Sequence, residues 1–168
     1  MSKLRIVLGL QLLFFAAWGG FLLSSRNADS PEFYLETVPV DPRDLLSGTY
    51  VALTYDISAP KAGGCPSFAK FGPVFVKLED KGRTANTEAG PVHVYEAADC
   101  SKNPPREPGW AAGKLHYGFR GTTVLYGIEK FFLNENDPRK DARSGSVIAR
   151  VKIDRRRQLV LLDLVKKL

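Results

Sequence analysis

The sequence predicts a mainly β protein, with an N-terminal transmembrane helix followed by one antiparallel β-sandwich or partly open β-barrel domain. An apolar run of helix length occupies residues 6–23. Beyond it, short runs of alternating apolar and polar residues are separated by turns rich in Gly and Pro, which is typical of strands. About eight such runs follow one another, and this spacing favours a sandwich or barrel.

The run 6–23 is 18 residues long, and Gln11 is its one strongly polar member. This length just meets the requirement for a helix that crosses the hydrocarbon core of a bilayer. Lys3 and Arg5 precede the run. The positive-inside rule therefore predicts a cytoplasmic N-terminus, with everything after Arg26 outside the cytoplasm.

A cleaved signal peptide is the alternative, because residues 17–19 place small side chains at cleavage spacing. We favour an uncleaved anchor because the apolar run continues to Leu23 and no small-x-small site follows it. We therefore expect a membrane anchor over 1–25 and one extracytoplasmic β-rich domain over 26–168.

The expected domain is moderately basic. Without Lys3 and Arg5, the 24 basic residues of the chain leave 22 against 18 acidic ones, a net of +4. Residues 150–168 hold seven basic and two acidic side chains. We expect no nucleic-acid partner, because the compartment is wrong and no recognition motif is present. The run 155–157, Arg-Arg-Arg, is either a solvated hairpin tip or a contact for anionic lipid headgroups of the bilayer.

The pattern of alternation and turn residues defines the candidate strands. They are 33–40, 49–57, 73–80, 91–97, 114–119, 122–126, 146–153 and 159–166. Turns are expected at 81–82, 120–121 and 154–158. The segment 127–135 can extend a strand or form a short helix, because its apolar spacing fits both.

A capped turn is predicted to launch the strand 49–57. Asp41 is placed as an N-cap before Pro42, and Asp44 completes a variant of the capping box. Gly48 suits the left-handed position that ends such a turn. The strand that follows places Val51, Leu53, Tyr55 and Ile57 on one face.

Gly48, Tyr50, Leu53 and Tyr55 match the pattern Gly-Asp-Tyr-x-x-Leu-x-Tyr, with Thr49 in place of the Asp. The segment thus resembles the signature of the GDYXXLXY family, small membrane-anchored bacterial proteins with no established biochemical activity. The segment 126–129, with the Phe pair and Glu135 beyond it, resembles a second recurrent patch of that family more loosely. The resemblance also implies a multi-pass membrane protein as partner, because genes for such proteins typically lie beside those of the relatives.

The signature is also the best candidate for a binding site. Its charged residues lie close to tyrosines, which combine a broad apolar ring with a hydrogen-bonding tip. The candidate binding residues are Asp41, Arg43, Asp44, Tyr50, Tyr55 and Glu129. A turn that aims a strand explains the same motif without any ligand, and we favour that structural interpretation.

Cys65 and Cys100 both lie in segments that look like loops. In an oxidising compartment an even pair predicts a disulfide, which would stabilise the domain by roughly 4 kcal/mol for a loop of about 36 residues. Two free thiols remain an alternative. A redox or metal role fits less well, because there is no Cys-x-x-Cys spacing and no adjacent His.

We expect no catalytic residues, no metal site and no cofactor. Ser47 has neither a Gly-x-Ser-x-Gly nor a Ser-x-x-Lys context. His93 and His116 lack a second ligand at helical or hairpin spacing. The sequence therefore favours a non-enzymatic accessory or interaction module for a multi-pass membrane protein. The alternatives are an envelope hydrolase and a periplasmic module that binds lipid or another ligand.

Overall fold

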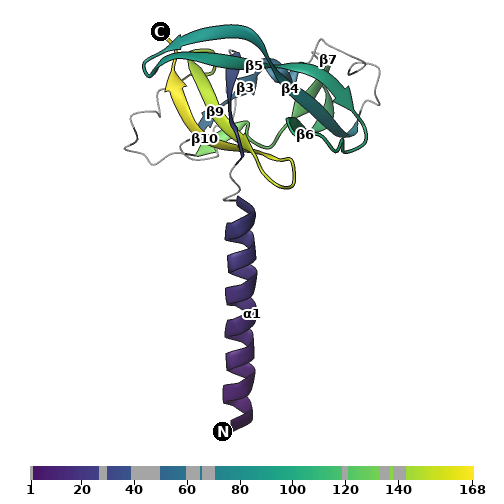
Figure 1. The fold of residues 1–168 in the computed structure, drawn as a ribbon, viewed down its shortest axis with the longest axis vertical. Coiled ribbons are helices and arrows are strands. Elements are labelled where there is room, and N and C mark those ends of the chain that lie inside the picture. The colour runs from purple at the N-terminus through teal and green to yellow at the C-terminus, as the bar shows by residue number, and fades with distance from the viewer. Residues whose placement is uncertain are drawn as a thin grey trace.

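The computed structural model of the protein describes residues 2–26, 30–38, 50–59, 65, 71–118, 121–132, 137 and 143–168. Within these residues, an N-terminal helix, α1 (Ser2–Arg26), precedes a β domain and extends away from it in Figure 1. Its segment Leu4–Leu22 has 19 residues and a mean hydropathy of 1.6, and none of it is buried. The helix is therefore long and apolar enough to cross a membrane, as predicted.

The described strands form one large curled sheet and one small sheet (Figure 1). Along its main path the large sheet has the order β10-β9-β1-β5-β4-β6-β7, and β3 also pairs with β1. Its strands are β1 (Glu32–Val38), β3 (Thr54–Tyr55), β4 (Gly72–Thr87), β5 (Gly90–Ser101), β6 (Trp110–Gly118), β7 (Gly121–Leu125), β9 (Val147–Ile153) and β10 (Leu159–Lys166). The small sheet pairs β2 (Tyr50–Ala52) with β8 (Lys130–Phe132). The predicted class, a helix followed by a partly open barrel-like β domain, is confirmed.

Strand β1 joins the two halves of the large sheet. It pairs antiparallel with β9 along 32–36, and its end pairs antiparallel with β3 at Thr37 and Val38. At Tyr34 it pairs with Val94 of β5, and this pair is parallel. The parallel pair is a local exception to the expected antiparallel arrangement, and it connects the β9–β10 hairpin to the strands β4 to β7.

The turn predicted at 81–82 is wrong. β4 continues through Lys81 and Gly82 and forms a long hairpin with β5, with an irregular register between Asp80 and Thr84. Gly82 has φ +80° and donates its N–H to Asp80 Oδ1 at 2.7 Å. The glycine therefore accommodates a bulge that bends the strand, a role that glycines in strands often have, and the chain does not reverse there.

The predicted single strand 49–57 is divided in the structure. β2 pairs with β8, β3 pairs with β1, and a 3₁₀ turn, η1 (Asp56–Ser58), follows. Between the two strands, Leu53 donates its N–H to the carbonyl of Glu129 at 2.8 Å. The predicted alternation of faces is correct, because the side chains of the apolar face are all buried: Val51, Leu53, Tyr55 and Ile57. The backbone partners change along the segment, which the alternation does not indicate.

The ambiguous segment 127–135 contains the short strand β8 at 130–132. The other predicted strands agree with observed ones, although β5 and β6 are longer than expected. The turn at 154–158 connects β9 to β10 as predicted. The core lies inside the curled sheet, where Leu35, Val74 and Val151 have no exposed surface.

Candidate functional site

The structure divides the candidate binding residues into two groups. Asp41, Arg43 and Asp44 lie outside the described residues, and so does the rest of the predicted turn at 41–49. Tyr50, Tyr55 and Glu129 are described, and Tyr55 and Glu129 lie in two segments that contact each other. These are 50–58, which carries the end of the signature, and 126–132, which carries the second patch.

Two tyrosines connect these segments reciprocally. Tyr55 is 1% exposed and donates its hydroxyl to the carbonyl of Ile128 at 2.6 Å. Tyr126 is 6% exposed and donates its hydroxyl to the carbonyl of Ile57 at 2.9 Å. Each segment thus supplies a buried ring and receives a hydrogen bond on its backbone. We call Tyr55, Tyr126 and Glu129, with the backbone groups they bind, the tyrosine latch.

Glu129 holds the turn that positions the second segment. Its carboxylate accepts the N–H of Tyr126 at 2.5 Å and the N–H of Gly127 at 2.9 Å. Gly127 has φ +82°, a conformation that glycine adopts without a steric penalty. The Glu129 carbonyl accepts the Leu53 N–H described above. Glu129 therefore acts within the fold, although it also borders an outer hollow of about 420 Å³.

The latch favours neutral tyrosines. Burial raises the pKa of Tyr55 and of Tyr126 far above the ordinary value, and the negative charge of Glu129 raises both further. A buried phenolate would lose its hydration and face a nearby carboxylate. Both hydroxyls therefore stay protonated and serve as hydrogen-bond donors, not as bases.

Gly113 on β6 provides the space for the latch. A Cβ atom at this position would lie 2.4 Å from Val124 Cγ1, 3.1 Å from the carbonyl oxygen of Leu125 and 3.3 Å from the ring of Tyr126. A side chain there would force the Val124 side chain to shift and would crowd the Leu125 carbonyl and the Tyr126 ring. The ring of Tyr126 covers the glycine and thereby joins the latch to the edge of the large sheet.

Tyr50 has a different environment from Tyr55. It is half-buried on β2, its ring centroid lies 5.9 Å from that of Phe132, and Lys130 Nζ lies 4.7 Å from its ring. Phe132 is 67% exposed. Of the candidate binding residues that the structure describes, Tyr50 is thus the one that lies beside an exposed aromatic surface.

Cys65 and Cys100 form a disulfide with Cα atoms 5.2 Å apart, so the predicted bond is confirmed. The expectation that Cys100 lies in a loop is wrong. It is the penultimate residue of β5, opposite Val76 of β4. The sequence before it contains charged residues that hide the strand, and one of them, Asp99, accepts the Cys100 N–H at 2.7 Å.

The two histidines lie on strands separated by β4, with His93 on β5 and His116 on β6. His93 Nδ1 lies 3.0 Å from Asp80 Oδ2, across the β4–β5 hairpin. In the described ranges, no group of three or more His, Cys, Asp or Glu residues is placed to hold a metal ion. Ser47 lies outside those ranges.

Sequence reasoning missed a buried polar contact beside the latch. Ser144 donates its hydroxyl to the carbonyl of Val38 and accepts the N–H of Thr54 at 3.1 Å. Thr37 donates to the carbonyl of Val147 at 2.5 Å and accepts the N–H of Gly145 at 2.8 Å. These hydroxyls join segments about a hundred residues apart, and no local pattern in the sequence indicates them.

Comparisons with known proteins identify the family to which the chain belongs. A comparison with curated proteins and with solved structures found no significant match. A family model described as GDYXXLXY protein matches residues 13–164, which includes the end of the helix and nearly all of the β domain. Both segments of the latch lie within that match, and the chain belongs to the GDYXXLXY family, whose function is unknown.

Proposed function

We propose that this protein is a single-pass, membrane-anchored component of the bacterial inner membrane whose β domain is a non-enzymatic accessory module for a multi-pass membrane protein. In this proposal the anchor covers 1–25, the N-terminus is cytoplasmic, and the domain over 26–168 is extracytoplasmic. The observation that carries the proposal is α1, because Leu4–Leu22 is apolar and wholly unburied.

The surface of α1 supports a membrane environment. Leu13, Phe15 and Phe21 are each more than 60% exposed, and they point in different directions around the helix. A helix that is apolar all round is stable when lipid or other transmembrane helices cover it. Lys3 and Arg5 on its N-terminal side support the proposed orientation.

The surface of the β domain next to Tyr50 is the proposed contact for the partner protein. The latch tyrosines are buried and have partners within the fold, so they offer no surface to another molecule. Tyr50 and Phe132 lie next to each other at the surface of the small sheet. Exposed aromatic side chains are enriched where proteins meet, so we propose that this pair contacts the multi-pass partner.

The test is affinity capture of the full-length protein from membranes solubilised in a mild detergent. We expect a multi-pass membrane protein to be recovered, and Phe132→Ser to reduce its recovery at least fivefold without a change in thermal unfolding. Leu125→Ser is the matched control, because Leu125 is also an exposed apolar residue, on β7.

Fractionation tests the anchor separately. We expect an unprocessed N-terminus and resistance to extraction by alkaline carbonate. A soluble mature protein that begins near Gly20 would contradict the anchor. Equal recovery of the partner by wild type and Phe132→Ser would contradict the proposed contact surface.

A further inference from the structure

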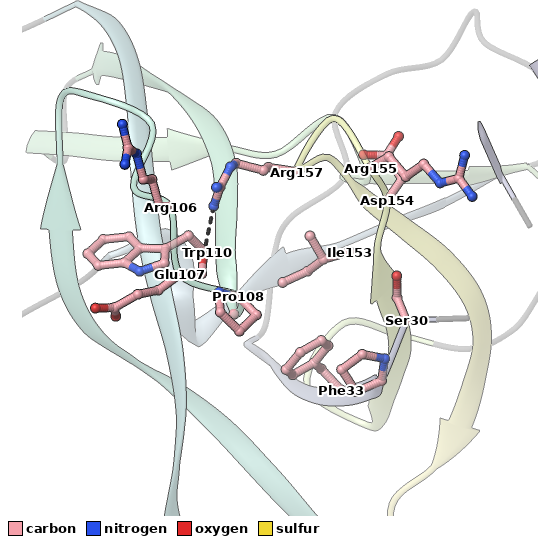
Figure 2. Close-up of a pocket in the computed structure, with 12 residues that line it drawn as sticks. Ser30, Phe33, Arg106, Glu107, Pro108, Trp110, Ile153, Asp154, Arg155 and Arg157 are labelled. Atoms are coloured by element: carbon pink, nitrogen blue, oxygen red, sulfur yellow. Dashed lines mark hydrogen bonds between the residues drawn. The ribbon is translucent and has the colours of Figure 1, made fainter. Parts of the chain in front are cut away.

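A pocket of about 290 Å³ lies where the chain enters the β domain. One wall consists of Ser30, Pro31 and Phe33, from the segment that leads from α1 into β1. The other walls are the loop before β6, which includes Arg106; the first residue of β6, Trp110; and the β9–β10 turn. We call this the basic pocket, because Arg106, Arg155 and Arg157 line it (Figure 2).

The β9–β10 turn is fixed against the loop before β6, so the pocket is formed in advance. Ala112 donates its N–H to the carbonyl of Arg157 at 2.7 Å, and Arg157 Nη1 donates to the carbonyl of Glu107 at 3.0 Å, the dashed line in Figure 2. Asp154 Oδ1 accepts the N–H groups of Arg156 and Gln158, each at 2.8 Å.

Arg157 occupies an unusual position for an arginine. Its φ is +65°, a left-handed conformation that favours glycine or asparagine, and in the described chain it is the one non-glycine residue with positive φ. A glycine here would relieve the backbone but would remove the guanidinium that reaches toward Glu107 in Figure 2. An outlier of this kind is a reason to look for a function of the side chain.

The arginines of this region have unused binding capacity. Among the described residues, no carboxylate lies within ion-pair distance of Arg106, Arg155 or Arg156. The indole N–H of Trp110, which is 7% exposed, also has no hydrogen-bond partner there. Glu107 and Asp154 also line the pocket, but three arginines against two carboxylates leave its lining at +1.

The basic residues at the other end of the β9–β10 hairpin are paired. Glu36 binds both Arg83 and Lys167, and Lys166 Nζ lies 3.2 Å from Glu88 Oε1. Of the two ends of this hairpin, the turn is therefore the one whose arginines have no ion pair among the described residues. In Figure 1 this turn lies on the side of the domain that faces α1.

In the anchored chain proposed above, the pocket lies near the membrane surface. Ser30 follows the last residue of α1, Arg26, by four positions, so an extended chain separates them by at most about 14 Å. The pocket also has apolar walls, formed by Phe33, Pro108 and Ile153. A free phosphate ion has no carbon groups to pack on these walls, whereas a glycerophospholipid carries the CH and CH₂ groups of its glycerol next to the phosphate.

We infer that the basic pocket binds the phosphodiester headgroup of an anionic membrane lipid, with Arg157 on the phosphate and the apolar walls on the glycerol region. The exposed Arg155 side chain extends away from Arg157 in Figure 2, and it would turn toward the phosphate when the lipid binds. This inference rests on the membrane anchoring proposed above. Arginine suits the role because its planar guanidinium forms paired hydrogen bonds with phosphate oxygens. The bound lipid would hold the β domain against the bilayer.

The indole signals of the full-length protein in uncharged detergent micelles give a direct test by ¹H–¹⁵N NMR. The chain has two tryptophans, so Trp18→Phe assigns the signal of Trp110. The titrants are dihexanoyl phosphatidylglycerol, dihexanoyl phosphatidylcholine and inorganic phosphate. We expect a saturable shift of the Trp110 signal with the anionic lipid, at a concentration at least tenfold lower than with either of the others.

The variants separate the pocket from general electrostatic attraction. Arg155→Ala should weaken binding about tenfold, whereas Arg156→Ala removes the same charge from the same turn outside the pocket lining and should weaken it less than twofold. Equal losses in the two variants would overturn the pocket in favour of diffuse attraction. An equal midpoint with inorganic phosphate would overturn the lipid as ligand.

A Trp110 signal that does not respond to any titrant would also overturn the inference. That result leaves the anchor intact if the protein still requires detergent to stay in solution. Full solubility without detergent would contradict the anchor itself. The dispersion of the backbone amide signals in the same spectra checks that each variant is folded.

Discussion

The tyrosine latch and the basic pocket lie in the same β domain, but they differ in whether their polar groups have hydrogen-bond partners within the chain. In the latch, both hydroxyls and both carboxylate oxygens bind backbone groups of the chain itself. In the pocket, arginine side chains and the Trp110 indole have unused capacity within the described chain. The buried tyrosine of the family signature, Tyr55, thus contributes to folding, while the polar groups suited to a lipid ligand lie outside the signature.

The largest effect should come from removing a latch ring. Tyr55→Ala should lower the free energy of unfolding by about 3–5 kcal/mol, because it removes a fully buried aromatic side chain and leaves a cavity. Chemical denaturation in detergent checks this value. Tyr117→Ala is the control, since Tyr117 is 49% exposed and should lose less than about 1 kcal/mol. Equal losses of unfolding free energy in Tyr55→Ala and Tyr117→Ala would show that the latch does not stabilise the fold more than an exposed tyrosine does.

The next effect is a loss of stability at alkaline pH. The pKa values of Tyr55 and Tyr126 are raised in the folded state, so above pH ~10 the unfolded chain releases two protons that the folded chain keeps. Their contribution to stability is complete below that pH and should fall by about 1.4 kcal/mol per tyrosine for each further pH unit. Denaturation at several pH values measures the slope.

The control for the alkaline effect is the double variant Tyr55→Phe and Tyr126→Phe, which has no latch hydroxyl to ionise. Its unfolding free energy should decline less steeply above pH 10 than that of the wild type, by about 2.7 kcal/mol per unit. The same slope in both proteins would contradict the raised pKa values and would assign the alkaline loss to lysines.

A smaller effect is expected from crowding the latch at Gly113. Gly113→Ala should cost about 1–3 kcal/mol, because the new Cβ would overlap Val124 Cγ1 at 2.4 Å and would lie only 3.1 Å from the Leu125 carbonyl oxygen. Thermal unfolding measures the loss. Gly90→Ala is not a matched control, since Gly90 has φ +109°, but Gly118→Ala is, because a Cβ there meets no atom closer than 4.0 Å.

The smallest effect on stability is expected in the pocket. Arg155→Ala should change the free energy of unfolding by less than about 0.5 kcal/mol, because Arg155 is exposed and has no ion pair among the described residues. Chemical denaturation without added lipid checks this. A loss of more than 1 kcal/mol would mean that the arginine acts in the fold, and the contrast between the two regions would disappear.

The sequence predicted those parts of the molecule that depend on local patterns. Alternation along 49–57 indicated the buried face that includes Tyr55, and the apolar run indicated α1. The turn at 154–158 also followed from its polar residues between two strands. Each of these features is decided by residues within about a dozen positions of one another.

Long-range contacts could not be predicted in the same way. Tyr126 reaches Ile57, 69 residues away, and no periodicity pairs them. The basic pocket likewise combines Ser30, Trp110 and Arg157. These residues are brought together by the parallel pairing of β1 with β5 and by the docking of the β9–β10 turn. Gly82 was taken for a turn because a bulge and a turn have the same local composition.

The most direct test of the structural role of the signature is the unfolding free energy of Tyr55→Phe, measured together with recovery of the proposed membrane partner. This variant keeps the ring and removes one hydroxyl, so the carbonyl of Ile128 loses its buried donor. We predict a loss of about 1–3 kcal/mol in stability and full partner recovery at temperatures where the variant is folded. Unchanged stability with loss of the partner would contradict the account, because Tyr55 would then act in recognition and not in the fold.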